Sequence, residues 1–158
     1  MRAVVMSVTV GMLLAGVCAP LAHADDVAIN GVYTAVSDGE WAKTNERYED
    51  RPSLISTWTV SSTCQNYLDC TGRVVSDHGW SADLSYRSGQ WWVAQTLPDW
   101  IRCPDGSTAP GKQGFSFWPD RANPAVLIGW DKTVGPSGAC GVNRWLTIEM
   151  PFTLTPRA

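Results

Sequence analysis

The sequence predicts an all-β protein, an antiparallel meander of about eight strands that forms either a small closed barrel or a sandwich. Three observations predict this fold. Apolar and polar residues alternate with a period of two over most of the chain after residue 24. Glycine, proline and aspartate separate these segments at short intervals. No stretch beyond residue 24 has a sustained helical period.

The N-terminal segment, residues 1–24, has the pattern of a cleaved secretory signal. Arg2 supplies the positive charge, an apolar stretch follows, and Ala22-His23-Ala24 is the small-x-small sequence that signal peptidase recognises. The apolar stretch is roughly 14 residues long, which is shorter than the roughly 20 needed to span a bilayer. We therefore expect cleavage after Ala24, secretion, and a single extracytoplasmic domain over residues 25–158.

Other kinds of membrane attachment and nucleic-acid binding have little support in the sequence. Ala15-Gly16-Val17-Cys18 loosely resembles a lipoprotein box, but the branched Val17 disfavours a lipid anchor on Cys18. No later apolar stretch approaches membrane-spanning length. The formal net charge is −3, and no basic patch is visible, so nucleic acid is not an expected partner.

The predicted strands follow one another at close spacing. Their ranges are Gly31–Ser37, Ser53–Ser62, Gly72–Ser76, Ser81–Tyr86, Gln90–Leu97, Lys112–Trp118, Ala125–Trp130 and Trp145–Thr155. Trp58 and Trp130 fall on apolar strand faces and are expected in the core. Trp41 to Arg51 is the one stretch in which a short helix could form, and Pro52 would end it.

A meander of eight strands can close on itself, which removes exposed edges and leaves room for one small ligand. Gly31-Val32-Tyr33 has the spacing of the Gly-x-Trp sequence that opens lipocalin barrels, with tyrosine in place of tryptophan. This similarity favours a lipocalin-like barrel, while the sandwich stays open.

Four cysteines remain after cleavage, and an even number in an exported chain predicts two disulfides. Cys64 and Cys70 bracket a short polar loop, whereas Cys103 and Cys140 each lie in a turn sequence, so the pairs Cys64–Cys70 and Cys103–Cys140 are favoured among three possible connectivities. The spacings do not match a zinc ribbon, and no metal or other cofactor is expected.

The order of these motifs resembles that of small secreted mycobacterial and other actinobacterial proteins. It is also similar to the extracytoplasmic C-terminal domains of some mycobacterial serine/threonine kinases. The shared motifs are Gly31-x-Tyr33, Trp58 with Ser62-x-Cys64, Asp69-Cys70-Thr71-Gly72, Trp91-Trp92, Cys103-Pro104-Asp105-Gly106, Gly138-Ala139-Cys140-Gly141 and Pro151-Phe152-Thr153-Leu154-Thr155. The resemblance implies an all-β extracytoplasmic module with a binding role and no kinase activity, and it implies no ligand residues.

Tryptophan is unusually frequent, with nine residues in the chain. Some must lie in the core or cap the ends of a barrel. Trp91 and Trp92 are adjacent on a predicted strand, so their side chains point to opposite faces. Aromatic rings near turns or on the surface can bind sugar rings or protein partners. The candidate ligand-binding residues are Trp41, Trp80, Trp92 and Trp100.

Catalytic chemistry has weaker support. His78 is the one histidine beyond residue 24, and Ser76-Asp77-His78-Gly79 is also an ordinary turn sequence. Paired carboxylates could hydrolyse glycosides, but most acidic residues lie in turns. No catalytic residue is therefore assigned.

The preferred function is a secreted, non-enzymatic binding module of the cell envelope or the extracellular space. Its partner would be an apolar small molecule inside a barrel, or an envelope glycan or envelope protein on an aromatic surface. The alternative is an extracytoplasmic hydrolase that uses His78 or paired carboxylates.

Overall fold

The computed structural model describes residues 27–157, and the predicted signal, its cleavage after Ala24 and the lipid anchor on Cys18 lie outside these residues. The described chain is a strand meander with two short 3₁₀ turns, η2 (Gly39–Trp41) and η3 (Ala139–Gly141). The strands are β1 (Gly31–Ser37), β2 (Lys43–Thr44), β3 (Arg47–Tyr48), β4 (Leu54–Asn66), β5 (Asp69–Ser76), β6 (Ser81–Arg87), β7 (Gln90–Arg102), β8 (Thr108–Pro119), β9 (Leu127–Val134) and β10 (Thr147–Pro156). The prediction of an all-β fold is confirmed.

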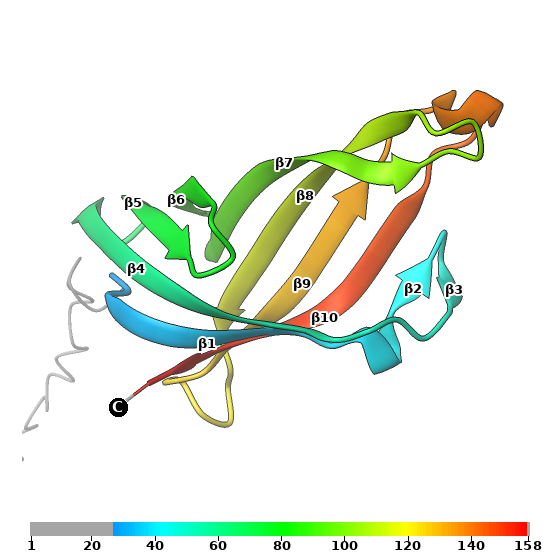
Figure 1. Ribbon diagram of the computed structural model, residues 1–158. Helices are drawn as coiled ribbons and strands as arrows, with labels where there is room; N and C mark the ends of the chain where they lie inside the picture. The colour runs from blue at the N-terminus through cyan, green and yellow to red at the C-terminus, as the bar shows by residue number, and fades with distance from the viewer. Residues whose placement is uncertain (1–26, 158) are drawn as a thin grey trace, which may run out of the picture.

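The strands close into an antiparallel barrel. From β4 to β10 each strand pairs with the next along the chain, and β1 pairs with both β4 and β10 (Figure 1). The closing register places Tyr33 opposite Pro156 and Ser37 opposite Phe152. The barrel is therefore formed by β1 and β4 to β10, and the closed form, rather than the sandwich, is the observed one.

The stretch predicted as a helix is instead a small hairpin. Lys43 pairs with Tyr48 and Thr44 with Arg47, and β2 also pairs with β10. Asn45 and Glu46 turn the chain with φ of 47° and 69°, values that no right-handed helix contains. The Asn45 side chain accepts a hydrogen bond from the Thr147 amide at 2.9 Å, which ties the turn to β10. The helix prediction was wrong because the pairing with β10 is non-local.

The core is aromatic. Trp58, 1% exposed, contacts Phe115 edge to face with ring centroids 4.9 Å apart and Phe152 at 5.2 Å. Trp91, Phe117 and Leu154 are buried with them. Edge-to-face aromatic pairs add stability beyond the burial of their area. The core placement of Trp58 is confirmed.

Trp130 does not lie in the core, contrary to the sequence prediction. The inward positions of β9 are Leu127, Gly129, Asp131 and Thr133, and Trp130 is 39% exposed on the outside. Gly129 occupies the inward position beside Phe117, where an added Cβ would lie 1.9 Å from the Ser116 carbonyl oxygen. The inward positions on either side of Trp130 are Gly129 and Asp131, which are not apolar. Trp130, the apolar residue between them, was therefore wrongly assigned to the core.

The two ends of the barrel differ. At one end, residues 27–30 lie across the opening, and Val27 and Ile29 pack against the core. The Ile29 amide donates to Ser62 Oγ at 2.8 Å, and the Ser62 hydroxyl donates back to the Ile29 carbonyl at 2.8 Å. We call residues 27–30 the N-terminal plug. At the other end, β7 and β8 extend beyond the barrel as a long hairpin (Figure 1).

Both predicted disulfides are present. Cys64 and Cys70 are cross-strand partners near the tip of the β4–β5 hairpin. Cys103 at the β7–β8 turn is bonded to Cys140 in η3. Within residues 27–157, no helix is long and apolar enough to cross a membrane.

Candidate functional site

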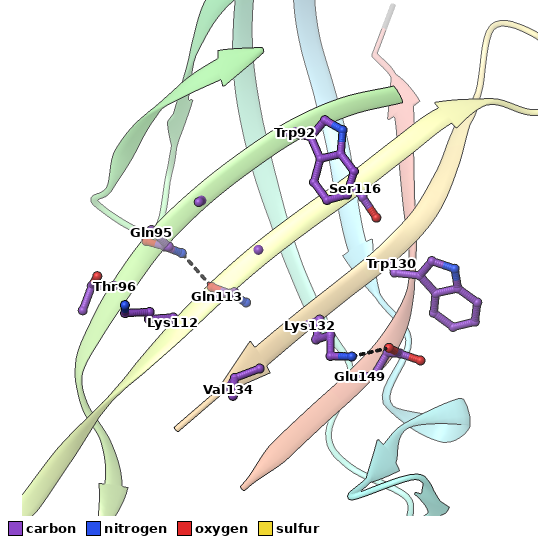
Figure 2. A pocket seen from close by; sticks show the side chains of 12 residues that line it. Trp92, Gln95, Thr96, Lys112, Gln113, Ser116, Trp130, Lys132, Val134 and Glu149 are labelled. Atoms are coloured by element: carbon purple, nitrogen blue, oxygen red, sulfur yellow. Dashed lines mark hydrogen bonds and ion pairs between the residues drawn. The ribbon is translucent and has the colours of Figure 1, made fainter. Parts of the chain in front are cut away.

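A groove on the outer surface of β7 to β10 is the first candidate binding site. Its volume is about 540 Å³. Residues of four neighbouring strands line it, most of them outward-facing, and Figure 2 shows Trp92, Ser116 and Trp130 among them. We call this surface the outer groove.

The strand register explains how the two tryptophans are placed. Trp92 on β7 is opposite Ser116 on β8, and Ser116 is opposite Trp130 on β9. The small side chain of Ser116 therefore separates two large exposed rings. Since neighbouring strands lie about 4.8 Å apart, the two tryptophan backbones are about 10 Å apart across the sheet. A ligand that contacts both rings must be longer than a single ring.

The next rows of the outer groove are polar and charged. Gly114 is opposite Lys132, and Lys132 is opposite Glu149, whose carboxylate lies 3.4 Å from the lysine Nζ (Figure 2). Lys43, on the β2–β3 hairpin, places its Nζ 5.8 Å from the centroid of the Trp130 ring. The outer groove thus combines aromatic faces with hydrogen-bond donors and acceptors.

The structure does not bring the four predicted ligand-binding tryptophans together. Trp92 lies in the outer groove. Trp41 is exposed in η2 and contacts Tyr48 edge to face at 6.4 Å. Trp80 faces the barrel interior, and Trp100 lies on the β7–β8 extension against Gly111. The residue that accompanies Trp92 is Trp130, which the sequence pattern predicts in the core.

A second cavity, of about 250 Å³, lies inside the barrel at the end opposite the N-terminal plug. We call it the inner cavity. Its apolar lining includes Trp58, Trp80, Phe115 and Phe152, and its polar lining includes Ser37, His78, Gln95, Gln113 and Asp131.

Asp131 is the centre of a buried polar network in the inner cavity. It is 2% exposed, and its carboxylate accepts a hydrogen bond from Ser37 Oγ at 2.7 Å. Gln113 Nε2 donates to both carboxylate oxygens at 2.9 and 3.0 Å, and Gln95 Nε2 donates to Gln113 Oε1 at 2.7 Å. Burial raises the pKa of the Asp131 carboxyl, and the hydrogen bonds from Ser37 and Gln113 partly oppose this effect.

Asp131 is not among the functional candidates that the sequence pattern indicates. The available signal was its spacing, because Asp131 lies four residues after Leu127 and therefore on the same face of an extended strand. The predicted strand ended at Trp130, so this relation was missed.

His78 lies at the turn between β5 and β6 and lines the inner cavity. Its Nε2 is 4.0 Å from Asp77 Oδ1 and the imidazole is about half exposed. The Thr57 amide donates a hydrogen bond to Asp77, which lowers the pKa of that carboxyl. None of the hydrogen bonds among residues 27–157 links a hydroxyl group to the His78 imidazole, as an activated serine would require.

Metal ligation has no obvious site in this part of the chain. No group of three or more histidine, cysteine, aspartate or glutamate side chains within residues 27–157 could hold a metal ion.

No protein-family model and no curated protein matches the chain. Among solved structures, the chain is similar to the sensor domain of the kinase PknI from M. tuberculosis, determined in its monomer form. The sequence identity is 14%, the match covers 84% of this chain and 89% of that chain, and the TM-score is 0.60. The likeness is one of fold, and it confirms the predicted resemblance to extracytoplasmic kinase domains at that level.

Proposed function

We propose that the protein is a non-enzymatic, extracytoplasmic binding module and that it binds an envelope oligosaccharide in the outer groove. The observation that carries this proposal is the row Trp92–Ser116–Trp130, in which two exposed rings flank a small residue on one face of a rigid sheet. The likeness to a sensor domain is consistent with a binding role.

An extracytoplasmic location is part of the proposal. Two disulfides are typical of proteins that fold in an oxidising compartment, and both bonds are formed in this fold. The signal pattern of residues 1–24 and the predicted cleavage after Ala24 agree with this location.

The chemistry of the outer groove favours a glycan over an apolar small molecule. Sugar rings present apolar C–H faces and a rim of hydroxyl groups, which match the tryptophan faces and the neighbouring Lys132 and Glu149 side chains. The inner cavity, at about 250 Å³, is smaller than the roughly 300–1,000 Å³ of typical ligand pockets, so it offers less support for a carrier of apolar molecules.

The test measures binding of two kinds of ligand. Isothermal titration calorimetry measures the binding of linear oligosaccharides, and co-sedimentation measures the binding of purified cell-wall polysaccharide. We expect W92A and W130A each to weaken binding at least tenfold, the scale typical of central aromatic residues in interfaces. W145A is the matched control, because Trp145 is 62% exposed and does not line the outer groove.

Equal loss in W145A, or unchanged binding in the W92A/W130A double variant, would contradict the glycan site. Binding of an envelope protein that depends on Trp92 and Trp130, with no glycan binding, would assign the outer groove to a protein partner instead. If the wild-type protein hydrolyses the oligosaccharide and the H78A variant does not, the result would support the hydrolase alternative.

A further inference from the structure

The inner cavity contains a buried carboxylate that forms no ion pair within residues 27–157. Asp131 is 2% exposed, and its three hydrogen bonds come from the neutral groups of Ser37 and Gln113. The ion pairs among residues 27–157 involve other carboxylates. Buried charges in proteins are normally paired with an opposite charge or a metal, so this carboxylate lacks its usual partner.

The carboxylate also has unused acceptor capacity. A carboxylate offers about four lone-pair positions. The Ser37 hydroxyl and the Gln113 amide approach it, and the Gln113 oxygen is already occupied by the Gln95 amide. A ligand that donates hydrogen bonds to Asp131 would therefore not need to displace this network.

The walls of the inner cavity suit a positive charge. Trp80 and Phe115 are stacked with an interplanar angle of 10°, and Trp58 contacts both rings. Aromatic faces attract cations, and the attraction is stronger where water is excluded. The buried Trp58 Nε1, in the lining of the same cavity, has no hydrogen-bond partner among the described residues, but as an N–H donor it adds nothing to the binding of a cation.

We propose that the inner cavity binds the primary ammonium group of a small organic amine, with Asp131 as its counter-ion and the Trp58, Trp80 and Phe115 rings as its walls. A volume of about 250 Å³ restricts the ligand to a small molecule or to the end of a longer one. A primary ammonium carries three donors, whereas a quaternary ammonium carries none and could use the aromatic walls alone. Gln95 and Gln113 line both the inner cavity and the outer groove, but the amine proposal does not depend on the glycan proposal.

The test uses n-butylammonium as the probe, with n-butanol and tetramethylammonium for comparison, at pH 8. Binding is followed by tryptophan fluorescence and by the indole N–H signals of Trp58 and Trp80 in ¹H–¹⁵N NMR spectra. We expect n-butylammonium to bind at least tenfold more tightly than either comparison compound and to shift both indole signals.

The variant D131N should weaken n-butylammonium binding at least tenfold and leave the weak binding of n-butanol unchanged. The control D83N removes a carboxylate that is exposed beside Arg73, and it should bind n-butylammonium like the wild type. Because the NMR shifts are measured on the wild-type chain, a D131N variant that fails to fold still leaves the proposal testable.

Three outcomes would overturn the proposal. They are equal affinity for n-butylammonium and n-butanol, unchanged affinity in folded D131N, and no shift of the Trp58 or Trp80 indole signals at saturating probe. Loss of glycan binding in W92A with intact amine binding would separate the two sites.

Discussion

At the scale of single residues, the alternation of side chains along a strand sends neighbouring residues to opposite faces of the barrel wall. Adjacent Trp91 and Trp92 were expected on opposite faces, and they are 1% and 45% exposed. Trp130 and Asp131 were missed because Gly129 has no side chain to mark the inward face and Asp131 is polar. The alternation rule holds on β9, but after Leu127 its inward residues Gly129, Asp131 and Thr133 carry no apolar side chain.

Asp131 should give the folded protein a distinct dependence on pH. Burial raises the pKa of the Asp131 carboxyl in the folded state. At pH values between the ordinary aspartate pKa and this raised pKa, the folded chain therefore keeps a proton that the unfolded chain has released. In that window the free energy of unfolding falls as pH rises, by about 1.4 kcal/mol for each unit by which the pKa is raised. Below this pH window Asp131 is protonated in both the folded and the unfolded state, so it contributes no pH dependence to the free energy of unfolding.

The variant D131N removes this titration, so its stability relative to the wild type should rise as pH increases through the window. Urea unfolding of both proteins between pH 4 and pH 8 measures the difference, and D83N serves as the exposed control. A difference between D131N and the wild type that does not change with pH would show that Asp131 is not the titrating group.

At the scale of elements, local features were predictable and extended ones were not. The pair Cys64–Cys70 could be chosen because it closes a short loop, and the turn sequences around Cys103 and Cys140 favoured the second pair. The full length of β7 was missed because Pro98 interrupts the predicted strand. In the structure, the register of β7 and β8 shifts between Leu97 and Ile101, and this irregularity accommodates the proline.

The two disulfides should differ in how much they stabilise the fold. Cys103–Cys140 joins residues 37 apart, whereas Cys64–Cys70 joins residues 6 apart. The loop-entropy relation gives about 4 kcal/mol for the first bond and about 2 kcal/mol for the second. Urea unfolding of C103S/C140S and C64S/C70S, each against the wild type, tests this order, and a larger loss in C64S/C70S would contradict it.

At the scale of the whole molecule, the sequence predicted a meander but left the barrel and the sandwich open. The deciding contact is the pairing of β1 with β10, which joins the two ends of the described chain. No local pattern reports such a pairing. For the same reason the outer groove, which needs the register of four strands, could not be assembled from the sequence, although Trp92 was among the candidates.

The N-terminal plug should contribute to the stability of the whole barrel. A chain that begins at Gly31 loses the contacts of Val27 and Ile29 with the core and the hydrogen bonds with Ser62. From partial burial of two aliphatic side chains and about 1 kcal/mol for each hydrogen bond, we expect a loss of about 2–4 kcal/mol. Thermal and urea unfolding of this chain, compared with one that begins at Asp25, measures the effect, and equal stability of the two would refute it.

The pairing of β1 with β10 also has a consequence for the order of folding. Residues 31–37 meet residues 152–156 in the closing ladder, so the barrel can close only after nearly the entire chain is available. Until then β1 and β9 each keep an unpaired edge, which is the feature that promotes association between chains. Non-local pairing of this kind also slows folding, because the entropy of closing a long loop is lost before the contacts form. During ribosomal synthesis or translocation the N-terminus emerges first, so the barrel stays unclosed until β10 emerges. The lifetime of this unclosed state determines how long the chain is exposed to aggregation and proteolysis.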